Sequence, residues 1–269
     1  MPGRVEGKVA FITGAARGQG RSHAIRLAEE GCDIIAVDAL EDYPTVRYAM
    51  SSRSELDETV RAVEALDRRI VAAKADVRDA ATLRATLDAG VAELGRLDIV
   101  CANAGIYTVQ SWDQVTPQVW QDTIDTNLTG VWNTMVVAIP HLIAAGGGSI
   151  IATSSTAGLK GMPFLAPYVA TKHAVVGLCR SLANELAGHH IRVNTVHPAG
   201  VDTPMVTGAE TIEPFVSRNP ELGAIFTNGM PVEALDPRDV SNAVLWLASE
   251  EARYVTGAAL TVDAGNTIR

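Results

Sequence analysis

The sequence predicts an α/β fold in which residues 1–269 form a single doubly wound (Rossmann) domain around a seven-stranded parallel sheet. Two observations support this prediction. Short runs rich in β-branched residues alternate with longer amphipathic stretches, and the runs are apolar almost throughout, as strands are when helices cover both faces of a sheet. A chain of 269 residues, 47% of them hydrophobic, is also long enough to bury one large core.

The individual elements follow from this alternation. The expected strands are the short apolar runs at residues 9–13, 33–38, 70–75, 97–102, 149–154, 191–197 and 259–262. The expected helices are the amphipathic stretches at residues 21–30, 55–67, 80–94, 117–127, 167–186 and 237–248. No internal repeat and no low-complexity linker interrupts the order, which favours one domain over two.

Two segments do not fit the alternation. Residues 40–54 follow the second strand and are expected to form an inserted loop before a helix capped at Ser54, because Ser54 and Asp57 approximate a capping box. Residues 198–231 are rich in Thr, Pro and Gly but also contain large apolar side chains. A loop this long inside a compact domain is usually a lid or disordered, and the apolar content favours a substrate lid.

Composition limits the partners and the compartment. A net charge of −9 without any Lys/Arg-rich run argues against a nucleic-acid partner. The three cysteines are widely spaced, so buried reduced thiols are expected, and no pair of histidines with a nearby carboxylate predicts a metal site. With neither a signal-like N-terminus nor a membrane-length apolar stretch, the sequence predicts a cytoplasmic protein without a membrane partner. Three tryptophans are expected to pack in the core or between subunits rather than against substrate: Trp112, Trp120 and Trp132.

A glycine-rich turn follows the first expected strand and leads into a helix. Gly14, Gly18 and Gly20 have the spacing Gly-x3-Gly-x-Gly, with Arg17 and Gln19 between them. Such glycines let the backbone approach a pyrophosphate, which rests on the helix N-terminus where free N–H groups and the helix dipole attract anions. Three glycines can be ordinary turn residues, but the strand before them and the helix after them favour nucleotide binding.

Asp38, at the end of the second expected strand, bears on the choice of nucleotide. A carboxylate there can accept hydrogen bonds from the adenosine ribose hydroxyls, although Asp38 could also be an ordinary turn residue. Arg17 favours NADP, because it could pair with a 2′-phosphate. The clash between that phosphate and Asp38 is the stronger effect, since unit charges ~4 Å apart near a surface interact by about 4 kcal/mol. The sequence therefore predicts NAD as the cofactor.

Tyr168 and Lys172 are spaced to share one face of the expected helix at residues 167–186. At this spacing the two Cβ atoms lie roughly 5–6 Å apart, and an ammonium that close favours the phenolate. An interaction of ~4 kcal/mol would lower the pKa of the phenol by roughly three units, toward the range where a general acid/base works best. The pair alone is a weak signal, because Tyr-x-x-x-Lys occurs by chance in many helices.

Further polar residues are expected at the same sheet edge. Ser155 follows the fifth expected strand, Asn103 follows the fourth, and parallel sheets bind ligands at the carboxyl ends of their strands. Together with the glycine turn, with Asn127 and with the Tyr168–Lys172 pair, these residues resemble the short-chain dehydrogenase/reductase family over essentially the whole chain. The order of these motifs along the chain is highly specific to that family.

The resemblance implies a role for each site residue. Tyr168 would be the acid/base, Ser155 would hydrogen-bond the reacting oxygen, Lys172 would lower the tyrosine pKa and bind the nicotinamide ribose, and Asn127 would hold a water linking Lys172 to solvent. The implied cofactor contacts are Asp76 and Val77 at the adenine, Asn103, Ala104 and Gly105 along the dinucleotide, and Val201 and Thr203 at the carboxamide. The sequence departs from the family pattern at Ala102, where many members have a second Asn, and at Ala199, which separates the usual Pro and Gly.

A narrower resemblance comes from residues 14–24 and from the insertion after Asp38. Both are similar to the carveol-dehydrogenase-like, mycofactocin-associated subgroup. That resemblance implies a hydrophobic secondary alcohol or ketone as substrate, a tightly held NAD and a redox peptide as electron acceptor. Apolar residues near the site agree with a hydrophobic substrate: Ile106, Tyr107, Leu159 and Met162. The family resemblance also implies a homotetramer.

Two other functions remain open. A catalytically silent NAD-sensing protein could share the fold, but it would not be expected to keep Asn127, Ser155, Tyr168 and Lys172 at working spacing. An NADP-dependent reductase of carrier-linked ketoacyl groups would need a basic rim for the carrier phosphate. Asp38 and the net charge of −9 both count against that reductase.

Overall fold

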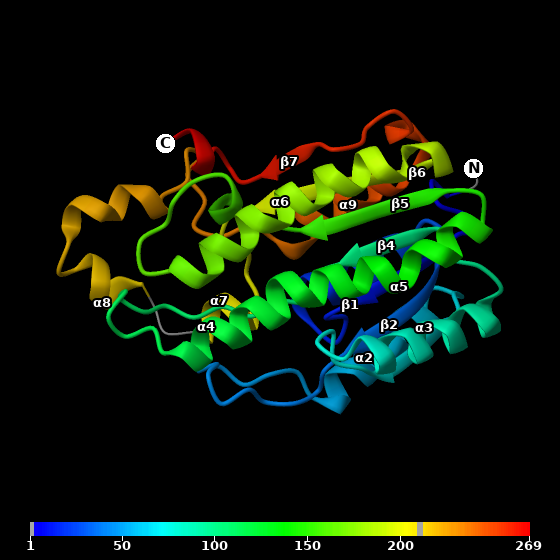
Figure 1. Ribbon diagram of the computed structural model, residues 1–269, viewed down its shortest axis with the longest axis horizontal. Coiled ribbons are helices and arrows are strands. Elements are labelled where there is room, and N and C mark those ends of the chain that lie inside the picture. Colours follow the sequence, from blue (N-terminus) through cyan, green and yellow to red (C-terminus); the bar gives the residue numbers. More distant parts are fainter. Residues whose placement is uncertain (1–2, 209–211) are drawn as a thin grey trace.

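The computed structural model of the protein describes residues 3–208 and 212–269. Its centre is a seven-stranded, all-parallel sheet with the order β3-β2-β1-β4-β5-β6-β7. The strands are β1 (Val9–Thr13), β2 (Asp33–Asp38), β3 (Ile70–Lys74), β4 (Ile99–Ala102), β5 (Gly148–Thr153), β6 (Ile191–Pro198) and β7 (Ala259–Val262). The predicted fold class, a doubly wound α/β arrangement with a seven-stranded parallel sheet, is confirmed (Figure 1).

Helices cover both faces of this sheet. The longer ones are α1 (Gly18–Ala28), α2 (Arg53–Glu64), α3 (Ala80–Leu94), α4 (Pro117–Ile124), α5 (Gly130–Ala144), α6 (Ala166–Leu186) and α9 (Pro237–Ala248). Side chains of α3, α5 and α6 form one core with the sheet, and side chains of α1, α2 and α9 form the other. Within β1, Phe11 belongs to the first core and Ile12 to the second, because successive strand side chains point to opposite faces. Figure 1 views the sheet from the side of α5 and α6.

Several element boundaries differ from the sequence prediction. Helix α1 begins at Gly18, so the end of the glycine turn already forms its first turn. The expected helix at residues 117–127 ends as an α-helix at Ile124 and continues through a π-helical segment, Asp125–Thr129, into α5. A π-helical turn inside an α-helix often marks a functional site, and this one contains Asn127.

The cap of α2 was predicted at the wrong serine. Ser52, not Ser54, is the N-cap: its hydroxyl accepts a hydrogen bond from the Glu55 amide at 3.3 Å, and the Glu55 carboxylate accepts one from the Ser52 amide at 2.7 Å. The capping box therefore pairs Ser52 with Glu55 two residues earlier than expected. A glutamate three residues after the cap reaches back to the cap amide, which the shorter Asp57 is less suited to do.

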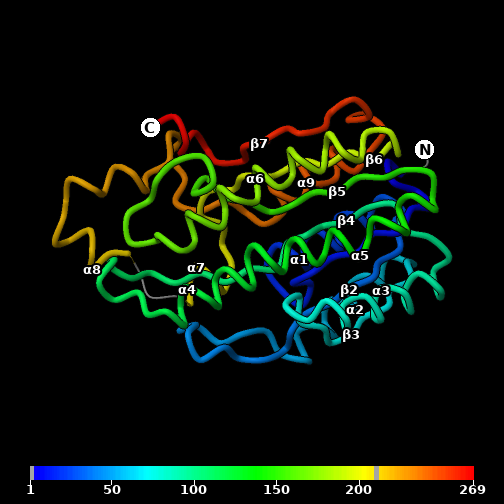
Figure 2. Tube along the Cα trace, viewed as in Figure 1, coloured from blue at the N-terminus to red at the C-terminus, as the bar shows by residue number. Residues whose placement is uncertain are grey.

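Both irregular segments lie at the carboxyl-end edge of the strands, the left end of Figure 1. The inserted loop runs from the end of β2 to α2, and Figure 2 shows it as the blue loop at the lower left. The segment after β6 contains α7 (Pro204–Thr207), α8 (Glu213–Val216) and a 3₁₀ turn, Pro220–Phe226. Residues 209–211 of the expected lid lie outside the described residues. The strand order reverses between β1 and β4, which places a ligand-binding crevice at this same edge.

The three cysteines are buried, whereas Trp112, Trp120 and Trp132 are exposed. All three cysteines are buried free thiols, as expected. Trp112, Trp120 and Trp132 are 86%, 45% and 43% exposed, so none of them packs in the core of the chain, and packing between subunits stays a prediction. Among the residues that the structure describes, no helix is long and apolar enough to span a membrane.

Candidate active site

A cavity of about 470 Å³ opens at the carboxyl ends of the strands, at the edge where the strand order reverses. Most of the predicted site residues line it: Gly14, Arg17, Gly18, Gln19, Asp38, Val77, Asn103, Ala104, Gly105, Ser155, Tyr168, Lys172, Val201 and Thr203. Gly20, Asp76 and Asn127 do not line it. The structure therefore gathers residues from seven separate segments of the chain, and the three exceptions have other places in the fold.

Glycines bring the phosphate loop close to its neighbours. A Cβ on Gly20 would lie 2.0 Å from the Gly14 carbonyl oxygen, so only glycine lets α1 pack this closely on the turn. Gly18 has a φ of +54°, and a Cβ there would lie 3.2 Å from the Thr203 methyl group, so the turn and the segment after β6 face each other. The N-cap residue Arg17 makes no capping hydrogen bond from its side chain. The first N–H groups of α1 are therefore left for an anion.

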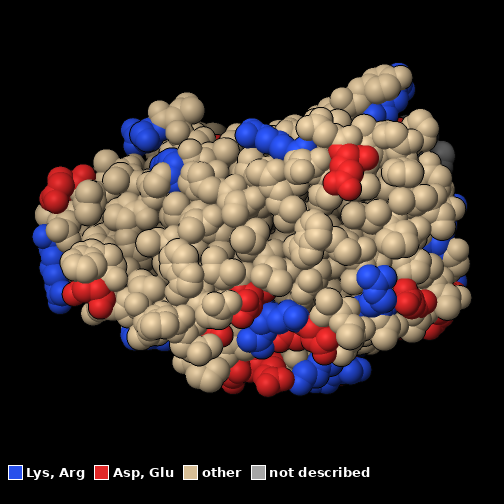
Figure 3. All heavy atoms as spheres, viewed as in Figure 1, with Lys and Arg blue, Asp and Glu red and all other residues tan. Residues whose placement is uncertain are grey.

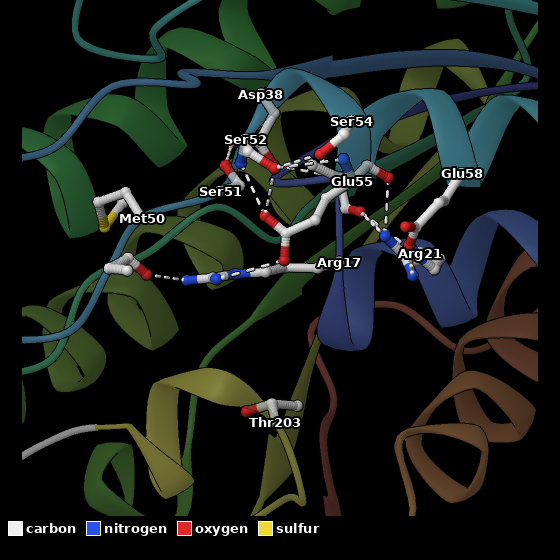
Figure 4. A network of polar contacts seen from close by, with 12 residues as sticks. Arg17, Arg21, Asp38, Met50, Ser51, Ser52, Ser54, Glu55, Glu58 and Thr203 are labelled. Atoms are coloured by element: carbon white, nitrogen blue, oxygen red, sulfur yellow. Dashed lines mark hydrogen bonds and ion pairs between the residues drawn. The ribbon is translucent and has the colours of Figure 1, made fainter.

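Asp38 is held from two sides at the end of β2. Its carboxylate accepts a hydrogen bond from the Ala16 amide at 2.9 Å and another from the Ser51 hydroxyl at 2.5 Å. The first bond ties Asp38 to the phosphate loop. The second ties it to the inserted loop (Figure 4). Each carboxylate oxygen can accept more than one hydrogen bond, so the side chain can still bind ribose hydroxyls.

Arg17 is not available to a 2′-phosphate in this arrangement. One nitrogen of its guanidinium donates to the Ala49 carbonyl oxygen, and another lies 3.4 Å from the Glu55 carboxylate (Figure 4). From the sequence, Arg17 could have paired with a 2′-phosphate; in the structure its guanidinium is bonded within the protein instead. The positive charge of Arg17 is thus compensated within the protein, by the Ala49 carbonyl oxygen of the inserted loop and by Glu55 in the first turn of α2. The Glu55 carboxylate is a second negative charge near Asp38 (Figure 4).

The inserted loop forms a wall of the cavity through Tyr43, Tyr48, Met50 and Ser51. The Arg78 guanidinium lies 4.0 Å from the Tyr43 ring centroid, and the Tyr43 hydroxyl donates to Asp76 at 3.1 Å. Asp76 also accepts hydrogen bonds from the Arg78 side chain, the shortest at 2.6 Å. Asp76 therefore holds Tyr43 in place and does not itself line the cavity, whereas its neighbour Val77 does.

Asn103 holds three strand ends together beside the cavity. Its side-chain amide donates to the Thr13 carbonyl oxygen at 3.0 Å, and its side-chain oxygen accepts from the Thr153 hydroxyl at 3.3 Å. The main-chain amides of Asn103 and Ala104 both lie within hydrogen-bond distance of the Thr13 hydroxyl, at 3.1 and 3.2 Å. These bonds fix the backbone of residues 103–105 along one wall.

Tyr168, Ser155 and Lys172 all line the cavity. The Lys172 ammonium donates to the Thr153 carbonyl oxygen at 2.7 Å and lies 5.4 Å from the Tyr168 ring centroid. The Ser155 hydroxyl oxygen accepts a hydrogen bond from the Ala157 amide at 3.1 Å. With its oxygen fixed in this way, the Ser155 hydroxyl can donate its own proton toward a reacting oxygen.

The predicted lowering of the Tyr168 pKa by Lys172 is wrong for the chain by itself. Burial raises the pKa of Tyr168 to about 12, and the hydrogen bond from Ser155 offsets only part of this effect. Burial also lowers the pKa of Lys172 to about 8. The physical reason is that the ammonium is bonded to Thr153 and lies over the phenol ring, while both groups are taken out of water.

Asn127 lies just behind this cluster, within the π-helical segment. Its side chain accepts from the Ile106 amide and donates to the Ile106 carbonyl oxygen, both at 2.8 Å. A Cβ on Gly105 would lie 3.2 Å from the Asn127 side-chain oxygen and 3.7 Å from the Lys172 nitrogen, so the three residues are neighbours. Asn127 therefore fixes the backbone that follows Gly105, and its predicted water-holding role stays a prediction.

Apolar side chains line part of the cavity, and several of them come from the segment after β6. Of the residues expected there, Ile106, Tyr107 and Met162 line the cavity, but Leu159 is 39% exposed and does not. Lining residues from the segment after β6 include Met205, Val206, Ile212 and Phe226. Lys160 donates to the Ile225 carbonyl oxygen at 2.8 Å and to the Asn266 carbonyl oxygen at 2.6 Å, which links this segment to the C-terminal residues.

Sequence reasoning missed several residues that shape the site. Tyr43, Tyr48 and Ser51 belong to the insertion at residues 40–54, which was expected to fold over the adenosine half of the dinucleotide, but none of the three was predicted individually as a site residue. Thr153 lies within the expected strand at residues 149–154, yet its carbonyl oxygen holds Lys172. No motif marks these positions, since each acts through a contact that exists only in the folded chain. Among the described residues, no group of three His, Cys, Asp or Glu side chains lies close enough to hold a metal ion.

Comparison with known proteins identifies the family. Residues 8–213 match the short chain dehydrogenase family. The chain is 52% identical to a (−)-trans-carveol dehydrogenase of Rhodococcus erythropolis, with 99% of both chains covered. Among solved structures, a short chain dehydrogenase from Mycobacterium paratuberculosis bound to NAD is 51% identical, with a TM-score of 0.96 and 99% and 100% coverage. A carveol dehydrogenase from Mycobacterium avium in complex with NAD is 48% identical, with a TM-score of 0.93 and the same coverage. The chain belongs to the short-chain dehydrogenase family, and within it resembles carveol dehydrogenases.

Proposed function

We propose that this NAD-dependent alcohol dehydrogenase acts on a hydrophobic secondary alcohol or ketone similar to carveol, with Tyr168 as the proton-transfer group. The observation that carries the proposal is the convergence of Tyr168, Ser155 and Lys172 on a cavity whose substrate end is apolar. The identity of 52% with a (−)-trans-carveol dehydrogenase supports a cyclic, terpenoid-like substrate.

The residues present fit a nicotinamide dinucleotide. Uncapped N–H groups at the start of α1 suit the pyrophosphate, and the carboxylate of Asp38 suits the ribose. Gln19 and Thr126 both line the cavity and have a buried side-chain oxygen without a partner among the described residues, as expected where a polar ligand binds. A dinucleotide held by these residues would supply the acceptor for the hydride that leaves the alcohol carbon. We also propose that Val201 and Thr203 contact its carboxamide and that Ala104 and Gly105 lie along it.

The proton moves through the chain's own residues. Ser155 donates a hydrogen bond to the substrate oxygen and holds it beside the Tyr168 hydroxyl. During alcohol oxidation Tyr168 takes the proton, and during ketone reduction it gives the proton back. A pKa of about 12 keeps Tyr168 protonated at neutral pH, which suits reduction directly. Positive charge near the phenol favours oxidation; Lys172 supplies such a charge, and an oxidised nicotinamide would add to it.

We further propose that the inserted loop retains the cofactor. Two bonds tie it to the residues expected at the nucleotide: Arg17 to the Ala49 carbonyl oxygen, and Ser51 to Asp38. The bond from Tyr43 to Asp76 forms a third attachment. A loop held by these bonds favours slow release of NAD, and electrons would then leave through a redox peptide. In the alternative, the loop opens readily and NAD exchanges as an ordinary co-substrate.

The two other functions are less well supported. A carrier-linked reductase that uses NADP would need a free cation for the 2′-phosphate, but Arg17 is bonded to the inserted loop. A silent NAD-sensing protein would not require Ser155, Tyr168 and Lys172 to meet at an apolar cavity. We also propose a cytoplasmic location and a homotetrameric assembly, on the basis of the family resemblance.

One experiment tests both the substrate and the cofactor. The purified protein is denatured, and the released nucleotide is identified by mass spectrometry. The native protein is then mixed with trans-carveol, and the absorbance of NADH is followed over a single turnover. NAD in the first measurement and NADH formation in the second are expected. Released NADP, or no reduction of NAD by carveol or by other cyclic secondary alcohols such as cyclohexanol, would contradict the proposal.

A further inference from the structure

His197 is a fully buried histidine at the end of β6, next to the active site. Its Nδ1 lies 2.7 Å from the main-chain carbonyl oxygen of Ser155, and its Nε2 lies 2.7 Å from the Thr195 hydroxyl oxygen. From the sequence it was read only as the end of a strand. Both ring nitrogens are engaged, and one of the two partners is the residue expected to bind the reacting oxygen.

The partners of His197 determine which nitrogen carries the proton. A carbonyl oxygen can only accept, so Nδ1 carries the hydrogen and donates it to Ser155. Nε2 then has a lone pair to accept with, and the Thr195 hydroxyl lies closer to it (2.7 Å) than to its other acceptor, the Ala258 carbonyl oxygen (3.3 Å). Burial lowers the pKa of His197, and the nearby charges of Lys172, Arg180 and His173 on α6 lower it further, although the bond to Ser155 has the opposite effect. The imidazole is therefore neutral, in a single tautomer.

The hydrogen bond from His197 joins the end of β6 to Ser155, one residue beyond the last main-chain bond between β5 and β6. The last main-chain bond between these strands runs from the Ser154 amide to the Val196 carbonyl oxygen at 2.9 Å. Pro198 follows His197 and has no N–H, so the imidazole supplies the next donor. The Ser155 carbonyl oxygen also accepts from the Gly158 amide at 2.9 Å. Ser155 is thus held by the strand and by the turn that follows it.

We propose that His197 is a positioning residue for proton transfer: its Nδ1–H bond fixes the Ser155 main chain, and thereby the Ser155 hydroxyl, relative to the Tyr168 phenol. The inference rests on the proposed roles of Ser155 and Tyr168. It adds a residue that touches neither substrate nor cofactor and that is absent from the motifs found in the sequence. Its effect should appear in kcat, because misplacing a catalytic group by about 1 Å can cost about 10²-fold in rate.

Two variants separate the hydrogen bond from the volume of the side chain. His197→Leu fills the space without a donor, whereas His197→Asn keeps an N–H group near the position of Nδ1. With trans-carveol and NAD in single-turnover assays, His197→Leu should lower the rate about 10- to 100-fold. His197→Asn should stay within about threefold of the wild type, which is the scale of one weakened hydrogen bond. The affinity for NAD should be unchanged in both variants.

His23 provides a matched control. It is also fully buried, and its Nδ1 lies 2.8 Å from the Ser241 hydroxyl oxygen, where α1 packs on α9. His23→Leu should lower Tm as His197→Leu does, yet leave the rate of the folded protein unchanged. Equal loss of rate in the two leucine variants would overturn the proposal, because it would reveal a general effect of burying leucine in place of histidine.

Two further measurements show whether His197 acts through Ser155. In a Ser155→Ala background, His197→Leu should cost no more than about twofold in rate, since residues that act as a unit are not additive. Crystal structures provide a readout that needs no activity: the Ser155 hydroxyl should move relative to Tyr168 in His197→Leu and keep its place in His197→Asn. An unmoved Ser155 in His197→Leu would overturn the proposal. If the wild type oxidised no alcohol at all, the proposed function would fail, and the crystal structures would still decide on His197.

Discussion

The Ser51 hydroxyl donates a hydrogen bond to the Asp38 carboxylate, so a residue of the inserted loop is bonded directly to the residue expected to bind the ribose. On the other side, Asp38 accepts from the Ala16 amide of the phosphate loop. The choice of nucleotide and the position of the inserted loop therefore depend on the same carboxylate. Arg17, one residue after Ala16, is bonded to the loop as well.

This coupling predicts how the cofactor preference can be changed. Asp38→Ala alone should weaken NAD but not confer tight binding of NADP, because Glu55 still lies 3.4 Å from the Arg17 guanidinium. Adding Glu55→Gln removes that competing charge, and Arg17 can then pair with a 2′-phosphate. Calorimetry with NAD and NADP measures both affinities. Asp57→Asn in place of Glu55→Gln is the control, since Asp57 pairs with the exposed Arg53. Tight NADP binding by the single Asp38 variant would contradict the assignment of Glu55.

Tyr168→Phe tests the proton-transfer role. The phenol hydroxyl moves the proton, whereas the ring contacts Tyr107 edge-to-face at 5.4 Å and should still do so in the variant. We expect a loss of roughly 10²–10⁴-fold in the single-turnover rate, with the affinity for NAD preserved. Tyr107→Phe is the matched control, because it removes a neighbouring hydroxyl from the same cavity. A rate within tenfold of the wild type for Tyr168→Phe would rule out Tyr168 as the acid/base.

The buried ammonium of Lys172 predicts a pH dependence of stability. Burial lowers its pKa from 10.5 to about 8 in the folded chain, so the unfolded chain binds more protons between these two values. Stability rises with pH wherever the unfolded state binds more protons. The free energy of unfolding of the wild type should therefore rise relative to that of Lys172→Met as pH increases from 8 toward 10.5, by up to about 3 kcal/mol. Urea melts of both proteins measure this difference, and a flat difference across that window would contradict the predicted direction.

The predicted homotetramer can be tested by substitutions on the face of the molecule that α4 and α5 form. Trp120 and Trp132 are 45% and 43% exposed there, and Figure 3 shows that uncharged residues cover most of the middle of this face. Light scattering should give a tetramer and not a monomer of 28.4 kDa. Trp132→Glu should yield smaller species, whereas Arg61→Glu on the exposed side of α2 should not. A wild-type monomer at micromolar concentration would refute the prediction.

Sequence reasoning was strongest where a local pattern determines geometry. Strand β1, the glycine turn and the four-residue spacing of Tyr168 and Lys172 follow from periodicity, and they were predicted correctly. It failed where a contact joins distant parts of the chain. Nothing near Arg17 in the sequence indicates that Ala49 will accept its hydrogen bond, and nothing near Lys172 indicates that Thr153 will hold its ammonium. The pKa of Tyr168 was mispredicted for the same reason, because burial is a property of the whole fold.

The last prediction concerns retention of the cofactor. Purified protein should carry NAD, and free NAD should support only slow turnover until an artificial electron acceptor is added. Affinity differences between related complexes lie mainly in dissociation rates, so the anchors of the inserted loop should control release.

Arg17→Met removes the bond to the Ala49 carbonyl oxygen, and loss of such a charge-assisted hydrogen bond should speed NAD release by about tenfold or more. Deleting residues 41–50 should have a larger effect. This deletion retains Ser51, whose hydroxyl is bonded to the Asp38 carboxylate, and Ser52, the N-cap of α2. Arg53→Met is the control, since Arg53 is an exposed arginine paired with Asp57. Displacement of bound NAD by isotopically labelled NAD, followed by mass spectrometry, measures the release rate. Rapid multiple turnover by the wild type with free NAD alone would show that the loop opens freely, and the retention proposal would then be wrong.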